Sequence, residues 1–346
     1  MIRLLVVDDS AFARYAISRL VSADDGIEIL GFARDGVEAI EKTKELKPDV
    51  VTLDVEMPRM NGLETLERIM NEAPTPVVMV SSLTGEGTMH TIRALEIGAV
   101  DFFLKASSAN PVGSAASQDR LTTKIRTAAN VGRKGFTRPR ICSALPARTK
   151  KVTRAAADGL RKVVVIASST GGPGALYQVV PMLPEDLPAA VVLVQHMPAG
   201  FTRSLAERLD ELSQISVTEA VAGARLAAGQ ALMAPGGYHL VFGTGGVVAL
   251  NQDPPLVGLR PAADITMPSI ARLYGKSTIA AVLTGMGSDG TRGAVAVKEA
   301  GGTVVAQNEE TCVVYGMPRS VAEAQAVDYV VPLSEIAPTI TRLCRE

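Results

Sequence analysis

Long hydrophobic runs, paired cysteines and an excess of one charge are all missing from this sequence. No apolar stretch approaches the roughly 18 residues of a membrane-spanning helix, and the N-terminal MIRLLVVDDS passes directly into strand-like sequence, so we expect neither a signal peptide nor membrane insertion. The three cysteines, Cys142, Cys312 and Cys344, are widely spaced without a CxxC pair, which argues against disulfides and zinc and fits a reducing, cytoplasmic location. A formal net charge of -1 gives no global attraction to nucleic acid.

The first third of the chain alternates short β-branched runs with amphipathic stretches. The 346 residues are enough for about two domains of roughly 150 residues each. The runs lie at residues 4–7, 28–31, 50–53, 77–80 and 101–104. This alternation predicts a five-stranded parallel sheet covered by helices on both faces, in which ligands bind at the carboxyl ends of the strands.

The composition changes between about residues 106 and 160, where small residues and one plausible helix over 118–130 precede a basic segment. We therefore expect a first domain over 1–125, a basic flexible linker over 126–160 and a second domain over 161–346. The cations of the linker either keep a tether soluble or dock on an acidic surface. The second domain is again α/β and doubly wound, with its clearest strands at 163–167, 191–194, 281–284, 303–306 and 327–331.

Charged and polar side chains follow the strands of the first domain. They are Asp8 and Asp9 after the first strand, Asp54 after the third, Ser81 after the fourth and Lys105 after the fifth. Crowded carboxylates repel one another unless a cation joins them, and all-oxygen ligation favours Mg²⁺. A nucleophilic aspartate that forms an aspartyl phosphate is a known outcome of such sites. Acids that only cap turns would explain Asp8 or Asp9 alone, but not the whole set.

These motifs resemble a bacterial response-regulator receiver, which has a flavodoxin-like fold. The resemblance covers residues 1 to about 125 and rests on DD after the first strand, LDVEMPRMNG, SS after the fourth strand and FFLK at the fifth. It implies that Asp54 accepts phosphate, and that Asp9, Asp54 and the carbonyl group of Glu56 bind Mg²⁺ while Asp8 supports the waters of the metal. A sensor histidine kinase of the chemotaxis type would then be the phosphate source.

The same resemblance implies the receiver's switch residues. Ser81 would contact the phosphoryl oxygens, Lys105 would pair with the phosphate, and Phe102 would be the rotating aromatic residue. Ala106 departs from the pattern, because receivers usually have a proline with a cis peptide bond after the lysine.

The second domain contains a Ser/Thr/Gly turn between a buried strand and an expected helix, in VVVIASSTGGPGAL. Ser169 would be exposed at the strand end, close to helix amides that favour developing negative charge. The literal GxSxG pattern is absent. A phosphate-cradling dinucleotide turn is the competing interpretation, but GxGxxG is incomplete and no ribose-binding acid follows.

Histidine is scarce enough to be informative. His90 falls in a helix, where an ordinary surface position explains it, and His239 follows a turn, with either a structural role or a substrate contact. His196 ends a strand, at the edge expected for Ser169, and Asp289 stands at a helix start after another strand. Capping roles would explain His196 or Asp289 singly. Three strand ends that carry Ser, His and Asp favour a catalytic triad.

The blocks ASSTGGP, VVLVQHMPAGFTRSLAERL, APGGYHL, LTGMGSDG and AQNEETCVVYGMPRSVA resemble the catalytic domain of the chemotaxis protein-glutamate methylesterase and glutamine deamidase, from about residue 160 onwards. The resemblance implies Ser169 as nucleophile, His196 as general base and acid, and Asp289 as the residue that orients the imidazole. Thr170 would support the histidine, and the Met286 amide would stabilise the oxyanion. The implied substrates are methyl-accepting chemoreceptors, and no cofactor is implied for the esterase.

Two other classes of function compete with this hypothesis. A DNA-binding output domain is disfavoured, because the second half is too long and too α/β for a helix-turn-helix module. A non-catalytic, receiver-linked signalling adaptor stays open if the triad is misassembled.

Overall fold

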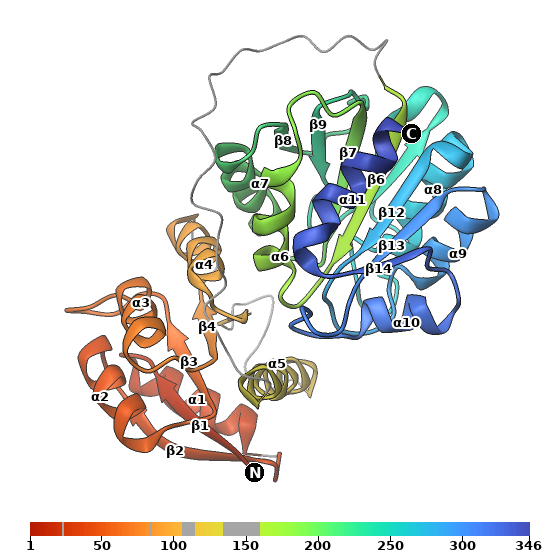
Figure 1. Ribbon diagram of the computed structural model, residues 1–346. Helices are drawn as coiled ribbons and strands as arrows, with labels where there is room; N and C mark the ends of the chain where they lie inside the picture. Colours follow the sequence, from red (N-terminus) through yellow and green to blue (C-terminus); the bar gives the residue numbers. More distant parts are fainter. Residues whose placement is uncertain (23, 83–84, 106–114, 134–159) are drawn as a thin grey trace. The chain divides into compact units, whose positions relative to one another are not determined.

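The computed structural model describes residues 1–22, 24–82, 85–105, 115–133 and 160–346. The chain divides into two compact units, Met1–Arg140 and Ile141–Glu346 (Figure 1). Most of the expected linker, including Lys134 and the basic residues that follow it, lies outside the described residues, as do Ala106 and Cys142. No helix of the described part of the chain is both long and apolar enough to cross a membrane.

The first unit is built from five β/α repeats. Its strands are β1 (Ile2–Val7), β2 (Ile27–Ala33), β3 (Val50–Asp54), β4 (Val77–Ser81) and β5 (Asp101–Leu104), and its helices are α1 (Ala11–Val21), α2 (Gly36–Leu46), α3 (Gly62–Glu72), α4 (Gly85–Ile97) and α5 (Ala115–Arg133). All neighbouring strands pair in parallel, in the order β2-β1-β3-β4-β5. The predicted five-stranded parallel sheet is therefore confirmed.

The helices of the first unit form two groups. Helix α1 contacts α5, whereas α3 contacts both α2 and α4. Strands β3 and β4 are buried along their whole length, as apolar strands covered on both faces should be. Helix α5 contains the predicted helix 118–130 and continues past the expected domain boundary at residue 125.

The loop after β3 is shaped by Gly62, the first residue of α3. A Cβ atom at this position would lie 2.1 Å from the carbonyl oxygen of Asp54, so only glycine allows the loop to return this closely to the strand end. Asn61 and Glu64 then form a capping box that starts α3. The MPRMNG segment thus fixes the backbone directly after Asp54.

The second unit has a larger parallel sheet, in the order β14-β13-β12-β6-β7-β9-β8. The strands are β6 (Lys162–Ser168), β7 (Ala189–Gln195), β8 (Ser216–Glu219), β9 (Gln230–Met233), β12 (Thr278–Val282), β13 (Thr303–Gln307) and β14 (Tyr329–Val331). Strands β10 (His239–Gly243) and β11 (Val247–Asn251) form a separate antiparallel hairpin. The predicted α/β fold of this unit is confirmed.

The helices of the second unit follow the strands. They are α6 (Gly172–Val179), α7 (Phe201–Leu212), α8 (Ala263–Tyr274), α9 (Thr291–Glu299), α10 (Met317–Glu323) and α11 (Leu333–Arg345), and short 3-10 turns lie at Val180–Met182, Thr244–Gly246 and Gly275–Ser277. Helices α8, α9 and α10, the hairpin and the central strands share one buried apolar cluster. This core holds the carboxyl ends of β6, β7 and β12 side by side.

Candidate functional site

The acidic residues of the first unit come together at the carboxyl edge of its sheet. Oxygen atoms of Asp8, Asp9 and Asp54 all lie within 4.8 Å of one another. The ammonium group of Lys105 lies 2.7 Å from Asp54 Oδ2 and 3.0 Å from Asp8 Oδ2. Two of the three carboxylates thus contact one lysine, and the oxygen-only donor set of all three fits a hard divalent cation such as Mg²⁺.

The carboxyl group of Asp54 is the most perturbed of this cluster. Only 3% of the residue is exposed, and this burial, with the charge of Asp8 adding to it, raises its pKa to about 6 despite the opposing effect of Lys105. For Lys105, burial alone would lower the pKa, but the Asp54 and Asp8 carboxylates outweigh burial and hold the pKa above its ordinary value. The site therefore carries uncompensated negative charge that a bound cation would offset.

Ser81 and Phe102 lie at the neighbouring strand ends. The hydroxyl of Ser81 is buried, faces the carbonyl oxygens of Ser82 and Gly87 and accepts a hydrogen bond from Thr91 at 2.7 Å. The Phe102 ring is 7% exposed and has the ammonium group of Lys124 5.8 Å from its centroid. Both side chains are packed inward in this structure, and their switch roles stay a prediction.

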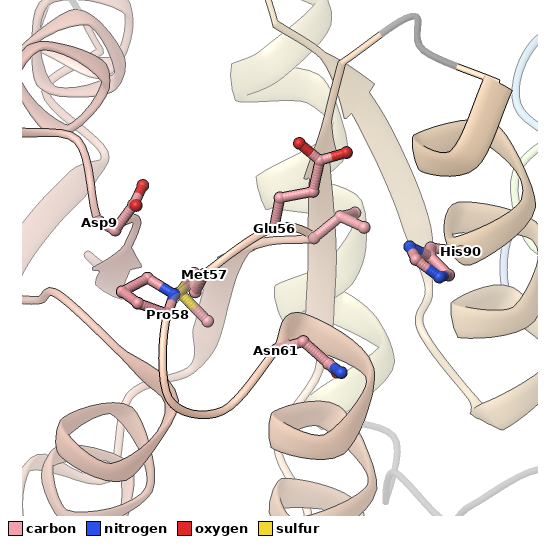
Figure 2. A pocket seen from close by; sticks show the side chains of 7 residues that line it. Asp9, Glu56, Met57, Pro58, Asn61 and His90 are labelled. Carbon is pink, nitrogen blue, oxygen red and sulfur yellow. The ribbon is translucent and has the colours of Figure 1, made fainter.

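An open cavity of about 440 Å³ lies beside the loop that follows β3. Val55 and Glu56, the two residues after Asp54, line it together with Asp9, and Asn61 comes from the start of α3. His90 on α4 faces the same opening (Figure 2). The sequence predicted a surface position for His90, and its side chain is indeed exposed. Its place beside the acidic loop was not predicted, because it depends on how α4 packs next to α3.

In the second unit, Ser169 directly follows β6 and is anchored by its backbone. Its N–H donates to the carbonyl oxygen of Thr284 at 3.1 Å, and its own carbonyl accepts from Gly172 N–H at 2.7 Å. A Cβ atom on Gly285 would lie 2.9 Å from the Ser169 Cβ atom, so the loop after β12 runs close against the serine. The turn after β6 and the loop after β12 thus pack directly against each other.

His196 and Asp289 form the best-defined polar pair of this edge. The Nε2 atom of His196 lies 2.6 Å from Asp289 Oδ2, and both side chains are largely buried. The backbone N–H of His196 donates to the carbonyl oxygen of Ser168 at 3.1 Å, which places the histidine next to the serine turn. The three strand ends therefore meet at one edge, as predicted.

Asp289 is held by the start of α8. Its Oδ2 accepts from the Ala263 N–H at 2.6 Å and its Oδ1 from the Asp264 N–H at 2.9 Å. Burial opposes ionisation, but the hydrogen bond and charge of His196 and the two amides lower the pKa of Asp289 below its ordinary value. Asp289 is therefore an anion that fixes the imidazole through Nε2.

Asp264 reciprocates this contact. Its Oδ1 accepts from the N–H groups of Gly290 and Gly293 at the start of α9, at 2.9 and 2.8 Å. Asp289 stands just before α9, as the sequence predicts, but its carboxylate binds the first amides of α8. Asp264, in the first turn of α8, binds the first amides of α9 in return. Burial is the main cause that raises the pKa of Asp264, and the charge of Asp289 adds to it.

The Ser169 hydroxyl and the His196 imidazole are not hydrogen-bonded to each other in this structure. Within the described residues, the Ser169 hydroxyl makes no hydrogen bond, and the buried Nδ1 atom of His196 has no partner. Because Nε2 is taken by Asp289, Nδ1 is the ring nitrogen left for the serine. Catalytic hydrogen bonds often tighten only when substrate binds. The role of each triad residue stays a prediction.

The expected supporting residues lie in the same two loops. Met286 is 48% exposed, and within the described residues its backbone N–H donates to no backbone or side-chain acceptor. The carbonyl oxygen of Thr170 accepts from the Thr284 hydroxyl at 3.1 Å, which ties the serine turn to the β12 loop again. A free amide beside the serine is suited to stabilise an oxyanion.

Two buried glutamines were not predicted. Gln195, at the end of β7, contacts Ser168, Ser169 and His196. Gln307, at the end of β13, accepts from Thr284 N–H at 2.8 Å and donates to the Thr311 carbonyl at 2.8 Å. The available signal was a polar amide directly after an apolar strand, at the edge that carries the site.

Of the two roles that the sequence left open for His239, its surroundings favour the structural one. It is fully buried in the hairpin, and its Nε2 atom lies 3.3 Å from the carbonyl oxygen of Pro254. No described contact links it to the Ser169 turn.

Comparison with known proteins assigns both units to described families. Residues 164–340 match the CheB methylesterase family, and residues 4–116 match the response regulator receiver domain. A "Protein-glutamate methylesterase/protein-glutamine glutaminase" of Symbiobacterium thermophilum is 49% identical over 359 residues, covering 100% of this chain and 98% of that protein. The protein of the same name from Thermotoga maritima is 46% identical, with 99% and 98% covered.

A solved structure also matches the second unit. The CheB methylesterase catalytic domain of Thermotoga maritima has 48% sequence identity and a TM-score of 0.51, and the match covers 53% of this chain and 98% of that domain. Both halves of the sequence-based resemblance are thereby confirmed.

Proposed function

The chain belongs to the CheB methylesterase family and carries a response regulator receiver domain, and from this premise we propose that it hydrolyses glutamyl methyl esters and deamidates glutamines on chemoreceptors with Ser169, His196 and Asp289. The observation that carries the proposal is the buried His196–Asp289 pair, 2.6 Å apart, at the sheet edge where Ser169 begins the turn after β6. The non-catalytic adaptor is not favoured by any contact of the site.

In this proposal each residue has one task in acyl transfer. Asp289 accepts from Nε2 and so leaves Nδ1 of His196 as the base that takes the Ser169 proton. The serine oxygen attacks the γ-carbonyl carbon, and the Met286 N–H donates to the oxyanion. His196 returns the proton to the departing methanol or ammonia, and water then releases the glutamate from the acyl-enzyme by the same route.

The first unit would regulate this chemistry through phosphorylation of Asp54. Asp8, Asp9 and Asp54, with the Glu56 carbonyl oxygen, would hold Mg²⁺, which when bound offsets the negative charge of the carboxylates and of the phosphoryl group. Lys105, now paired with two carboxylates, would contact the phosphoryl oxygens, as would the Ser81 hydroxyl. Movement of Ser81 and Phe102 would then carry the signal. The phosphate would come from a chemotaxis histidine kinase.

The experiment uses the full-length protein and methylated receptor. Methanol and ammonia release are measured with and without Mg²⁺ and a small phosphodonor, for the wild type and for Asp54→Asn. We expect wild-type turnover that rises on phosphorylation, and an Asp54→Asn protein that keeps basal turnover but takes up no phosphate. Wild-type protein without any turnover would refute the esterase, whereas Asp54→Asn protein phosphorylated at the wild-type rate would refute only the assignment of the phosphoacceptor.

A further inference from the structure

Gln195 joins the residue that carries the nucleophile to the residue that carries the base. It is the last residue of β7 and is only 2% exposed. Its Oε1 accepts from the Ser168 hydroxyl at 2.7 Å, and its Nε2 donates to the Ser169 carbonyl at 3.0 Å. The same Nε2 also lies 3.2 Å from the carbonyl oxygen of His196.

These contacts use the whole hydrogen-bonding capacity that distinguishes a carboxamide. One acceptor faces a hydroxyl and two N–H donors face two carbonyl oxygens, so neither a carboxylate nor a hydrocarbon of the same size can replace the set. The amide also lies close against the backbone of Gly172, because a Cβ atom at this position would lie 2.1 Å from Oε1. Only glycine at the start of α6 leaves room for the Gln195 amide.

The backbone alone leaves the two strand ends less constrained. One hydrogen bond, from His196 N–H to the Ser168 carbonyl, links β7 to the serine turn beyond the paired strands. The carbonyl oxygen of Ser169 accepts from Gly172 N–H and from Gln195 Nε2, and the carbonyl oxygen of His196 lies 3.2 Å from the same Nε2 atom. Gln195 thus contacts the backbone of both residues at once.

We propose that Gln195 is a positioning residue of the esterase, which sets the distance between the Ser169 hydroxyl and Nδ1 of His196. The inference rests on the proposed function and deepens it. Gln195 touches neither substrate nor reacting atoms, so its effect is on geometry. A displacement of about 1 Å between nucleophile and base can cost on the order of 100-fold in rate.

Two substitutions separate positioning from filling space. Gln195→Met keeps the volume but removes the acceptor and both donors. Gln195→Glu keeps an acceptor for Ser168 but places a charged group against two carbonyl oxygens. We expect kcat per folded enzyme to fall about 10- to 100-fold for both variants, with KM for methylated receptor within about twofold of the wild type.

The pH dependence of the Glu variant supplies a readout that a purely structural role would not move. A protonated carboxyl group can donate one hydrogen bond, so the ratio of Gln195→Glu to wild-type kcat should rise as the pH falls from about 8 to about 6. The rate at which a fluorophosphonate labels Ser169, measured by mass spectrometry on the full-length protein, should fall in parallel with kcat.

Gln230→Met is the matched control, because Gln230 begins β9, on a different strand and away from the Ser169 turn. It should leave kcat and labelling unchanged. Gln195→Met with kcat and labelling within about twofold of the wild type would overturn the inference, even if the variant were less stable. Wild-type protein that labels at Ser169 but releases no methanol would refute the proposed function instead, and slower labelling of Gln195→Met would then still support the inference.

Discussion

Replacing Asp289 with asparagine tests the triad with the smallest change in shape. Both carboxylate oxygens of Asp289 accept hydrogen bonds, Oδ2 from His196 and Ala263 and Oδ1 from Asp264. Asparagine has one oxygen and one NH₂ group, so in either orientation an N–H donor faces another donor. The imidazole also loses the anion that stabilises its protonated form.

The expected magnitudes follow from these contacts. Leaving one buried donor unsatisfied costs about 1–3 kcal/mol of the free energy of unfolding. Loss of the correct tautomer and of the counter-charge costs about 10⁴-fold in kcat in Ser-His-Asp enzymes generally, which corresponds to about 5 kcal/mol of transition-state stabilisation. We therefore expect Asp289→Asn protein to be folded, less stable and nearly inactive.

The assay compares methanol release from methylated receptor with urea unfolding of the same samples. Asp264→Asn is the control, since this neighbouring buried carboxyl group binds the α9 amides and does not touch His196. It should lose some stability but less than about tenfold in kcat. Folded Asp289→Asn protein with more than about a tenth of wild-type kcat would refute the triad.

Three further predictions concern the receiver domain and the linker. Burial raises the pKa of Asp54 to about 6, and a protonated carboxyl group neither binds a cation nor attacks phosphorus. The affinity of the protein for Mg²⁺ should therefore fall as the pH drops below about 6. Titration calorimetry that finds the same Mg²⁺ affinity at about pH 7 and about pH 5 would contradict this. Deleting residues 1–150 should raise methylesterase activity above that of the unphosphorylated full-length protein. Since tenfold activation needs only about 1.4 kcal/mol, a modest inhibitory contact of the receiver would suffice. A deletion protein no faster than the intact one would mean that the receiver activates the esterase and does not inhibit it. Replacing Arg138, Arg140, Lys150 and Lys151 with serine should leave turnover of the phosphorylated enzyme within about twofold of the wild type. The reason is that ion pairs of exposed cations generally contribute only about 0–1 kcal/mol each. A large loss of turnover would show that the linker docks specifically.

The sequence was most informative where strands are fully buried. The runs at 50–53 and 77–80 lie inside β3 and β4, because a strand covered on both faces must be apolar along its length. The run at 281–284 begins too late, since β12 is Thr278–Val282 and the apolar chain continues beyond the strand into the loop. Strands β8 and β9 and the hairpin of β10 and β11 were missed, because they are short and mix polar with apolar residues.

The parts of the site that were missed depend on contacts between distant segments. Asp289 and His196 could be chosen because strand ends of a parallel sheet meet at one edge. Gln195 and Asp264 could not be chosen in the same way, because their partners are mostly backbone groups that folding brings to them. Patterns of side chains along a sequence do not reveal such partners.

Ser169 as the nucleophile is tested most directly by methanol release from methylated receptor, measured for Ser169→Ala and Ser168→Ala proteins beside the wild type under phosphorylating conditions. Ser168 donates to Gln195 and is fully buried, whereas Ser169 is only partly buried and its hydroxyl makes no hydrogen bond within the described residues. We predict that Ser169→Ala abolishes release with the fold intact, while Ser168→Ala keeps measurable turnover. Release by folded Ser169→Ala protein at a rate near that of the wild type would contradict it.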